Sequence, residues 1–321
     1  GLIRGGHSVL EFSDRDIQSR NKKVIDVDGS KSLNKKFLNT CENIKPDLIL
    51  LGHADSISPL SLSIIKENFP SIKISQWFLD PLNKFGPDYE KNKKRIMDKV
   101  EFLDTNFLTT SPDSISFMKN KSNFFYIPNP CDKSFETLKN YEKNCPIDLF
   151  FALSHGVHRG ILKRGKSDDR EVFVKNLLNL TPNVKFDIYG MDSVQPVWGD
   201  NYLKALSNSK MGLNLSRGKP IKYYSSDRIT QLIGNGLLTF IDEKTKLDDF
   251  FSKDEVVFYK NINDLAEKIQ KYRSDEFNRK KIAKNGRNKY LKYFNSDLVA
   301  EFIIKKTFET KSKSNFIWSN Q

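Results

Sequence analysis

The chain has 321 residues, of which 38% are hydrophobic and 29% charged, and its formal net charge is +13. A chain of this length usually folds as two domains, and this composition excludes an intrinsically disordered protein. No apolar run reaches the roughly 20 residues of a membrane-spanning helix, and the first residues, GLIRGGHSVLEF, lack the apolar core of a signal peptide.

The positive charge is concentrated in the second half. Residues 1–150 contain 22 Lys and Arg against 20 Asp and Glu, whereas residues 151–321 contain 31 against 20, a net charge of +11. This half is expected to face a phosphate-bearing small molecule or an anionic membrane, unless its lysines only form a solvated surface. No nucleic-acid partner is expected, because the lysines are spread over many helices and no aromatic–basic motif is present.

The three cysteines, Cys41, Cys131 and Cys145, are odd in number and widely spaced. This pattern predicts free thiols in a reducing cytoplasm rather than a disulfide frame or a zinc site. We therefore expect a cytoplasmic protein, with peripheral attachment at the inner face of the membrane.

Along the chain, apolar segments of strand length alternate with amphipathic stretches, which is typical of βαβ units and parallel sheets. Pro112, after Ser111, is expected in the first turn of a helix. The predicted strands are 9–12, 48–51, 72–78, 107–109, 124–127, 149–152, 186–189, 212–215, 237–241 and 256–259. The predicted helices are 32–44, 169–179, 200–207, 226–234, 263–273, 276–292 and 296–309. A sheet of this type should open with a strand before the glycine turn at 5–6, so a further strand is expected to precede Gly1.

A domain boundary is expected within IPNPCDKSF, where prolines on both sides of Asn129 interrupt a strand. A segment with two prolines cannot continue as a central strand or as a helix, so it predicts a hinge. The expected division is an N-terminal domain over 1–130, a hinge over 131–146, a second domain over 147–295, and a C-terminal helix with a polar tail over 296–321.

An ordered set of segments carries a family resemblance: IDLFFALSHGVHRG, FDIYG, VWGDNYLKALSNSKMGLNLS, SSDRITQLIGNGLLTFID and DLAEKIQKY…RNKYLKYF. Together they resemble the spore-maturation-protein (CgeB-like) branch of group 1 GT-B glycosyltransferases, closely over about 146–295 and more loosely over 1–130. The resemblance implies an α/β fold of two Rossmann-like domains whose parallel sheets face a cleft. The N-terminal domain would bind the acceptor and the C-terminal domain the nucleotide of the donor.

The implied reaction moves a sugar from a nucleotide-diphosphate sugar to a hydroxyl acceptor. The charge of +11 in the second half, without a membrane-spanning segment, predicts that this acceptor is a cell-envelope glycan or a lipid-linked molecule. It needs no cofactor and no bound metal, and among the four histidines His155 and His158 have no third ligand at metal-binding spacing. The sequence does not distinguish retention from inversion.

The donor diphosphate is expected at the carboxyl ends of the second sheet, near the start of a helix. Arg228 follows Ser226 there, and its planar guanidinium suits phosphate oxygens. The alternative is that Arg228 pairs with Asp227 or Asp242. Further donor-binding candidates are His155, His158, Arg159 and Arg170 in and after the first loop, and Tyr189 and Gly190 at the end of FDIYG.

Gln231 occupies a position where the family usually has Glu, which often binds the donor ribose. The partner glutamate of that motif is also absent, because its position holds Tyr223. Glutamine can still hydrogen-bond a hydroxyl. A catalytically inactive binding module of the same fold therefore remains an alternative.

Residues 160–167, GILKRGKS, match the Walker A pattern, and LLTFID resembles a Walker B strand ending at Asp242. Five residues separate the preceding strand from Gly160, and the bulky interior ILKR does not suit the tight nest of amides around a phosphate. An NTPase is therefore the less favoured alternative.

In the first half, polar side chains end two predicted strands: His53 and Asp55 in ILLGHAD, and Asp80 in QWFLDP. Transfer with inversion needs a general base for the acceptor hydroxyl, and these three are the candidates. The alternative is that Asp55 caps a helix and Asp80 forms a turn before Pro81.

Overall fold

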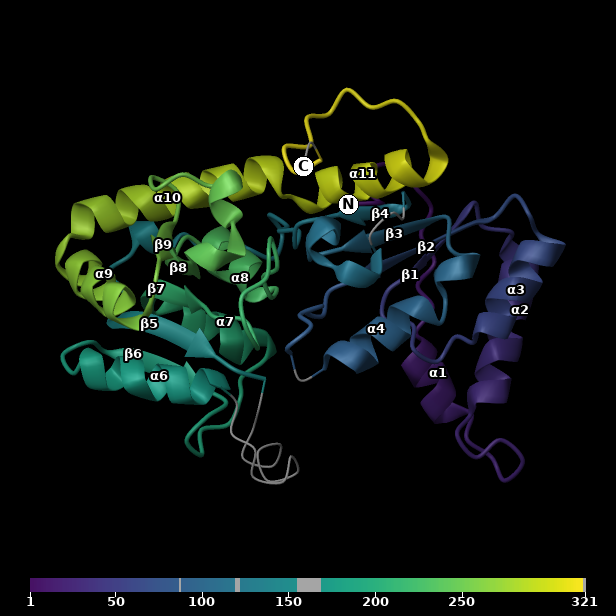
Figure 1. The fold of residues 1–321 in the computed structure, drawn as a ribbon, viewed down its shortest axis with the longest axis horizontal. Helices are drawn as coiled ribbons and strands as arrows, with labels where there is room; N and C mark the ends of the chain where they lie inside the picture. Colours follow the sequence, from purple (N-terminus) through teal and green to yellow (C-terminus); the bar gives the residue numbers. More distant parts are fainter. Residues whose placement is uncertain (87, 119–121, 155–168, 320–321) are drawn as a thin grey trace.

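The computed structural model describes residues 1–86, 88–118, 122–154 and 169–319, and its core is two parallel β-sheets placed end to end (Figure 1). The first sheet has the order β1-β2-β3-β4 and the second the order β6-β5-β7-β8-β9. The first sheet contains Leu48–Leu51 (β1), Lys73–Phe78 (β2), Thr105–Leu108 (β3) and Phe124–Tyr126 (β4). The second contains Ile147–Ala152 (β5), Phe186–Tyr189 (β6), Ser209–Asn214 (β7), Leu238–Asp242 (β8) and Val257–Tyr259 (β9).

Amphipathic helices connect and cover the strands, as parallel sheets require, because each crossover returns the chain to the same edge. In the first half the helices are Asp14–Arg20 (α1), Ser30–Ile44 (α2), Pro59–Asn68 (α3) and Tyr89–Met97 (α4). In the second half they are Asp169–Leu180 (α6), Gly199–Ser207 (α7), Arg228–Gly234 (α8), Ile262–Ser274 (α9), Glu276–Tyr293 (α10) and Ser296–Phe308 (α11). None of the helices in the described ranges is long and apolar enough to span a bilayer.

The predicted α/β architecture with two parallel sheets is confirmed, and most elements lie within a few residues of their predicted positions. The predicted strand 9–12 is wrong. Residues 7–13 are irregular, Leu10 is 59% exposed, and no strand of the sheet pairs with them. The helix expected to begin at Pro112 is only a short 3-10 turn that ends at Ser114.

The chain passes between the two sheets twice, at Cys131 and again at Asn295, and the two crossings lie side by side. The Cys131 amide donates to the Phe294 carbonyl over 2.9 Å, and the Ser296 amide donates to the Cys131 carbonyl over 2.8 Å. Arg4 also bonds to both crossings, through Asp132 and through Ser296. The first crossing lies at the start of the segment 131–146, for which a hinge remains a prediction.

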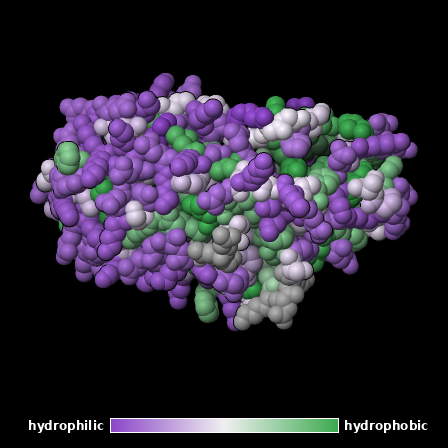
Figure 2. Space-filling model, turned by 90° about the horizontal axis from the view of Figure 1, so that it is seen from above, coloured by the Kyte–Doolittle hydropathy of each residue, from purple (hydrophilic) through white to green (hydrophobic). Residues whose placement is uncertain are grey.

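After the second crossing, α11 packs on the first sheet rather than on the second (Figure 1). Thr307 of α11 joins Ser75 and Thr105 in a buried ring of hydroxyls with separations of 2.6–2.9 Å. The segment beyond α11, expected to be a polar tail, folds back and buries Phe316 and Trp318 against Phe294 and Phe302. Figure 2, which looks onto α10 and α11, shows a largely hydrophilic surface at the α9–α10 end.

Gly286 lets α10 approach the backbone closely. A Cβ atom there would lie 2.1 Å from the Glu255 carbonyl oxygen. In an unhindered helix Gly→Ala gains up to about 1 kcal/mol, but this overlap is with backbone that cannot move aside. We expect Gly286→Ala to destabilise the protein by about 1–3 kcal/mol, measured as a lower Tm. The exposed Asn288→Ala on the same helix is the control, and a Gly286→Ala variant as stable as the parent would contradict the packing described.

Candidate functional site

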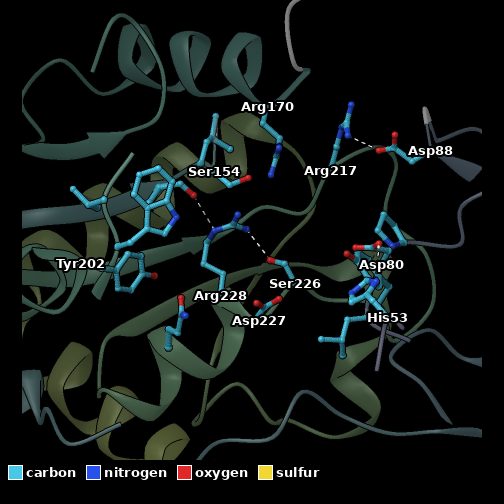
Figure 3. A pocket seen from close by; sticks show the side chains of 18 of the residues that line it. His53, Asp80, Asp88, Ser154, Arg170, Tyr202, Arg217, Ser226, Asp227 and Arg228 are labelled. Carbon is cyan, nitrogen blue, oxygen red and sulfur yellow. Dashed lines mark hydrogen bonds and ion pairs between the residues drawn. The ribbon is translucent and has the colours of Figure 1, made fainter. Parts of the chain in front are cut away.

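A cleft of about 750 Å³ lies between the carboxyl edges of the two sheets. Figure 3 shows its centre, with Arg228 and Arg170 pointing toward one another and His53 and Asp80 on the opposite side. The first half of the chain contributes His53, Asp80, Asp88, Lys91, Asn92 and Arg95. The second half contributes Glu136, Ser154, Arg170, Trp198, Tyr202, Arg217, Tyr224, Ser226, Asp227, Arg228, Gln231 and Asn235, among others.

Arg228 lies where strand order reverses in the second sheet. Its Nε donates to the Ala152 carbonyl at the end of β5 over 3.1 Å, and its Nη1 donates to the Leu215 carbonyl after β7 over 3.0 Å. Nη1 also donates to Ser226 Oγ over 2.7 Å. Strands β5 and β7 are neighbours from which the sheet grows in opposite directions. Ligands of doubly wound sheets bind at this switch point.

The positive charge of Arg228 is not neutralised by a neighbouring acid. No carboxylate in the described part of the chain forms an ion pair with it, so the expected alternative of pairing with Asp227 or Asp242 is not seen. Burial and then the charge of Arg170 lower the pKa of Arg228. Two guanidinium groups that repel each other in a partly buried site favour an anion between them.

The start of α8 contributes fewer free amides than the sequence suggests. The helix has only seven residues, and the amides of Ile229 and Thr230 donate to the carbonyls of Ser226 and Asp227. The Ser226 amide donates to Ser216 Oγ over 3.2 Å. The side chains of Arg228 and Arg170, rather than the helix end, are therefore the candidates for binding an anion here.

An aromatic wall from α7 and the residue before it borders the cleft beside Arg228. Trp198 is 67% exposed, whereas Tyr202 packs edge-on against Phe150 with its hydroxyl buried. That hydroxyl has no hydrogen-bond partner among the described residues, and burial raises the pKa of Tyr202 to about 12. A buried, protonated phenol without a partner is a donor available to a ligand.

On the opposite side, Arg95 of α4 holds all three predicted acid–base candidates. Its guanidinium donates to both oxygens of Asp55, over 2.7 and 2.8 Å, and to Asp80 Oδ2 over 2.6 Å. It also contacts His53 Nδ1, and it lies over the ring of Phe78. The structure thus brings His53, Asp55 and Asp80 together around one cation.

The contact with Arg95 decides what His53 can do. Nδ1 faces an N–H donor that never deprotonates, so Nδ1 accepts and the proton of the neutral ring lies on Nε2. Burial lowers the pKa of His53 despite the opposing charge of Asp80. The ring is therefore neutral at neutral pH and presents a hydrogen-bond donor, rather than a base, at Nε2.

Asp80 and Asp55 line different cavities. Asp80 lines the cleft, whereas Asp55 lines a second cavity of about 760 Å³ bordered by α2, α3 and the end of α4. Burial alone would raise the pKa of Asp55, but hydrogen bonds and charge from Arg95 outweigh it and lower the pKa. Among the three candidates, Asp80 is the carboxylate that faces the cleft.

The remaining predicted donor residues divide into three groups. Gln231 lines the cleft together with Ser226 and Arg170. Tyr189 and Gly190 are not among the lining residues, and the Tyr189 hydroxyl donates to Asp187 over 3.2 Å. Predictions for His155, His158 and Arg159, and for the Walker-like segment 160–167, fall outside the described residues.

Sequence reasoning missed Arg95, Glu136, Tyr202 and Trp198. Arg95 lies in the run KNKKRIM, which is typical of a solvated helix face, so nothing in the sequence distinguished it. Glu136 lies within the expected hinge; its Oε2 accepts from the Asp132 amide over 2.6 Å, and burial raises its pKa. Trp198 and Tyr202 belong to the segment VWGDNYL, whose paired aromatic residues at the start of a helix were the available signal.

Metal binding finds no support in the described part of the chain, where no three His, Cys, Asp or Glu side chains are grouped to hold an ion. Asp242, the expected Walker B residue, accepts a hydrogen bond from the Lys244 amide over 2.9 Å and so caps a 3-10 turn.

The loop between β7 and α8 reaches across to the first half of the chain beside the cleft. Arg217 pairs with Asp88, and the Lys219 carbonyl accepts from Asn83 over 2.5 Å. Lys222 pairs with Asp113 over 2.7 Å. These contacts hold the two sheets together at the cleft. They form a second connection between the halves, separate from the paired crossings.

Comparison with known proteins agrees with this architecture. Residues 168–305 match a family model described as glycosyl transferase-like. No curated protein matches the chain.

Several solved structures share the fold at low sequence identity. HepE of Anabaena in complex with UDP-glucose has a TM-score of 0.61 at 11% identity, covering 90% of this chain and 85% of HepE. TarM, known from S. aureus, has a TM-score of 0.57 at 13% identity over 87% of this chain. A glycosyltransferase from Rickettsia africae has a TM-score of 0.52 at 13% identity, covering 97% of this chain and 87% of its own. The chain spans 58% of the TarM chain.

These likenesses define the class of fold. The chain has the GT-B fold of glycosyltransferases, with two parallel α/β sheets facing a cleft, as expected from the sequence.

The state of His53 can be measured. We expect its ring to titrate below the ordinary value of 6.5, because burial disfavours the charged form. A lowered histidine pKa means that the unfolded chain binds more protons, so this group's contribution to stability is complete above pH 6.5 and is lost as pH falls below it. Arg95→Gln should raise the pKa by removing the neighbouring charge. The measurement is an NMR titration of the ring, assigned with His53→Gln, and a midpoint above 6.5 would contradict the assignment.

Proposed function

We propose that the protein is a glycosyltransferase that moves a sugar from a nucleotide-diphosphate sugar to a hydroxyl acceptor, as the resemblance to the CgeB-like branch implies. The observation that carries the proposal is the proximity of two guanidinium groups, Arg228 and Arg170, in the cleft at the switch point of the second sheet, where Arg228 donates to backbone carbonyls. The unpartnered hydroxyl of Tyr202 supports it, because a polar ligand would supply the missing partner.

In this proposal the donor lies along the second half of the cleft. The diphosphate binds between Arg228 and Arg170, near Ser226. The base lies against the aromatic wall, where Trp198 offers an exposed ring for stacking. Structural neighbours were solved with UDP and with UDP-glucose, which makes a uridine nucleotide the first to test.

Gln231 and Glu136 extend the same surface toward the donor's hydroxyl groups. Both line the cleft, and Glu136 is a carboxylate held in place through its Oε2. We propose that Glu136 supplies the charged acceptor that Gln231 cannot provide.

The acceptor binds on the side of the first sheet. In an inverting transfer, Asp80 takes the proton of the acceptor hydroxyl, and the hydroxyl oxygen of the acceptor attacks the anomeric carbon of the donor sugar. The bond from that carbon to the diphosphate breaks, and the two arginines stabilise the departing charge. Neutral His53 donates from Nε2 and orients the acceptor. No step in this scheme uses a metal ion or a cofactor.

The acceptor class and the location are also proposals. The three widely spaced cysteines support a cytoplasmic protein. The net charge of +11 over 151–321 supports attachment to an anionic membrane and action on a cell-envelope glycan or a lipid-linked acceptor. A thermal-shift panel of nucleotide sugars would identify the donor, because a ligand at 100 times its Kd adds about 2.7 kcal/mol to stability.

Arg228 tests the donor site. A charge-assisted hydrogen bond contributes about 1.5–3 kcal/mol, so Arg228→Ala should weaken UDP binding by about ten- to a hundredfold in calorimetric titration. Arg228→Lys should restore only part of the affinity, because an ammonium cannot form the planar fork. Arg273→Ala, on α9 and outside the cleft, is the control, with melting curves to verify folding. Unchanged UDP affinity in Arg228→Ala would overturn the donor site.

Asp80 and Asp55 form a matched pair, because Arg95 binds both but only Asp80 lines the cleft. Asp80→Asn should lower kcat for sugar transfer by about a hundredfold or more and leave UDP affinity unchanged. Asp55→Asn should have a much smaller effect on kcat.

The same assays separate the rival functions. UDP binding without turnover of any nucleotide sugar would favour an inactive binding module. Hydrolysis of Mg-ATP, without binding of UDP, would favour the NTPase.

A further inference from the structure

The turn between α1 and α2 places aliphatic side chains in solvent, far from the cleft. Val24 is 95% exposed, Ile25 85% and Val27 78%, among the highest values for large apolar residues in the described chain. Figure 1 shows this loop projecting at the edge of the molecule beyond the helices it joins. We call residues 22–28 the apolar turn.

The turn is a built structure rather than a loose loop. Lys23 and Asp26 exchange both backbone hydrogen bonds, over 2.9 and 3.0 Å, which leaves Val24 and Ile25 as the two central residues. The Asp26 carboxylate accepts from the amides of Lys31 and Ser32 at the start of α2, over 3.2 and 2.7 Å. The apolar residues are therefore held outward by a folded frame.

The residue types are unusual for an exposed turn. Turns are dominated by Gly, Pro, Asn, Asp and Ser, whereas the two central residues here are aliphatic. Val24 and Ile25 gain nothing from packing within the chain, because both are almost fully exposed. A local rule broken without a visible gain in the folded protein indicates a functional site.

The charges around the turn identify what it meets. Exposed Lys22 and Lys23 lie in the turn, and exposed Lys31, Lys35 and Lys36 lie in the first two turns of α2; none of them forms an ion pair with a described residue. Asp26 and Asp28 accept hydrogen bonds from the start of α2, so these five lysines exceed the two acids of the segment by three charges. Protruding aliphatic residues beside an excess of lysines complement a bilayer with anionic headgroups.

We propose that the apolar turn inserts Val24 and Ile25 into the interface of an anionic membrane, with the surrounding lysines bound to headgroups. The contact itself does not depend on the chemistry of the cleft. Its use in presenting a membrane-held acceptor rests on the proposed glycosyl transfer. Ser30 and Lys31, just after the turn, line the second cavity, and Arg95 lines both that cavity and the cleft.

The test is sedimentation of the full chain with vesicles of phosphatidylcholine, with and without phosphatidylglycerol. The parent should bind only the anionic vesicles, and binding should weaken as salt is raised. Val24→Ser/Ile25→Ser should weaken binding by about tenfold or more, because two inserted side chains are lost. Phe277→Ser, at a side chain 76% exposed on α10, is the matched control and should bind like the parent. UDP affinity should be the same in all variants, which separates this proposal from the donor site.

The fluorescence of a tryptophan variant provides a second test of insertion. The emission of Ile25→Trp should shift to shorter wavelength on addition of anionic vesicles, and brominated lipid should quench it. Three results would overturn the proposal: no binding by the parent, equal binding by the double serine variant, or an unshifted Ile25→Trp emission. A parent dimer that the serine variant converts to a monomer would assign the turn to a second copy of the chain instead.

Discussion

The pairing of the two chain crossings is the constraint on which the cleft depends. Cys131 bonds to both Phe294 and Ser296, so the two places where the chain crosses between the sheets are held together. Everything on the opposite side, from the carboxyl ends of β2 to those of β5 and β7, can then form a space open to a ligand. A single unpaired linker would leave the angle between the sheets free, whereas paired crossings restrict it.

The cleft that results is electrostatically divided. On one side Arg95 forms ion pairs with both Asp55 and Asp80, and so it holds these two carboxylates in place. On the other side Arg228 donates to neutral oxygens, and no carboxylate among the described residues pairs with it. This difference separates the structural role of Arg95 from the anion-binding role proposed for Arg228, although both side chains line the same cleft.

Much of the architecture was predictable because parallel strands buried on both faces produce continuous apolar runs. The strand 186–189 was predicted at its observed bounds, and Arg228, singled out because it lies in an ordered motif, lines the cleft. The errors have physical causes. The segment 9–12 has the composition of a strand but no partner for its hydrogen bonds, and the tail contains too few apolar residues to reveal that Phe316 and Trp318 are buried. The sequence did not predict the position of Arg95 in the cleft, because its contacts are with Asp55 and Asp80, which lie 40 and 15 residues earlier in the chain.

The hydroxyl ring of Ser75, Thr105 and Thr307 has a consequence for how the protein is made. Two of its members belong to the first sheet, and the third is 202 residues farther along the chain than Thr105. During synthesis the first sheet therefore emerges from the ribosome well before α11 exists, with one face still bare. Contacts so distant in sequence form slowly. Apolar strands that are exposed before α11 has been made are prone to aggregate. The nascent N-terminal half therefore lacks the cover of α11 on its sheet until that helix has been translated.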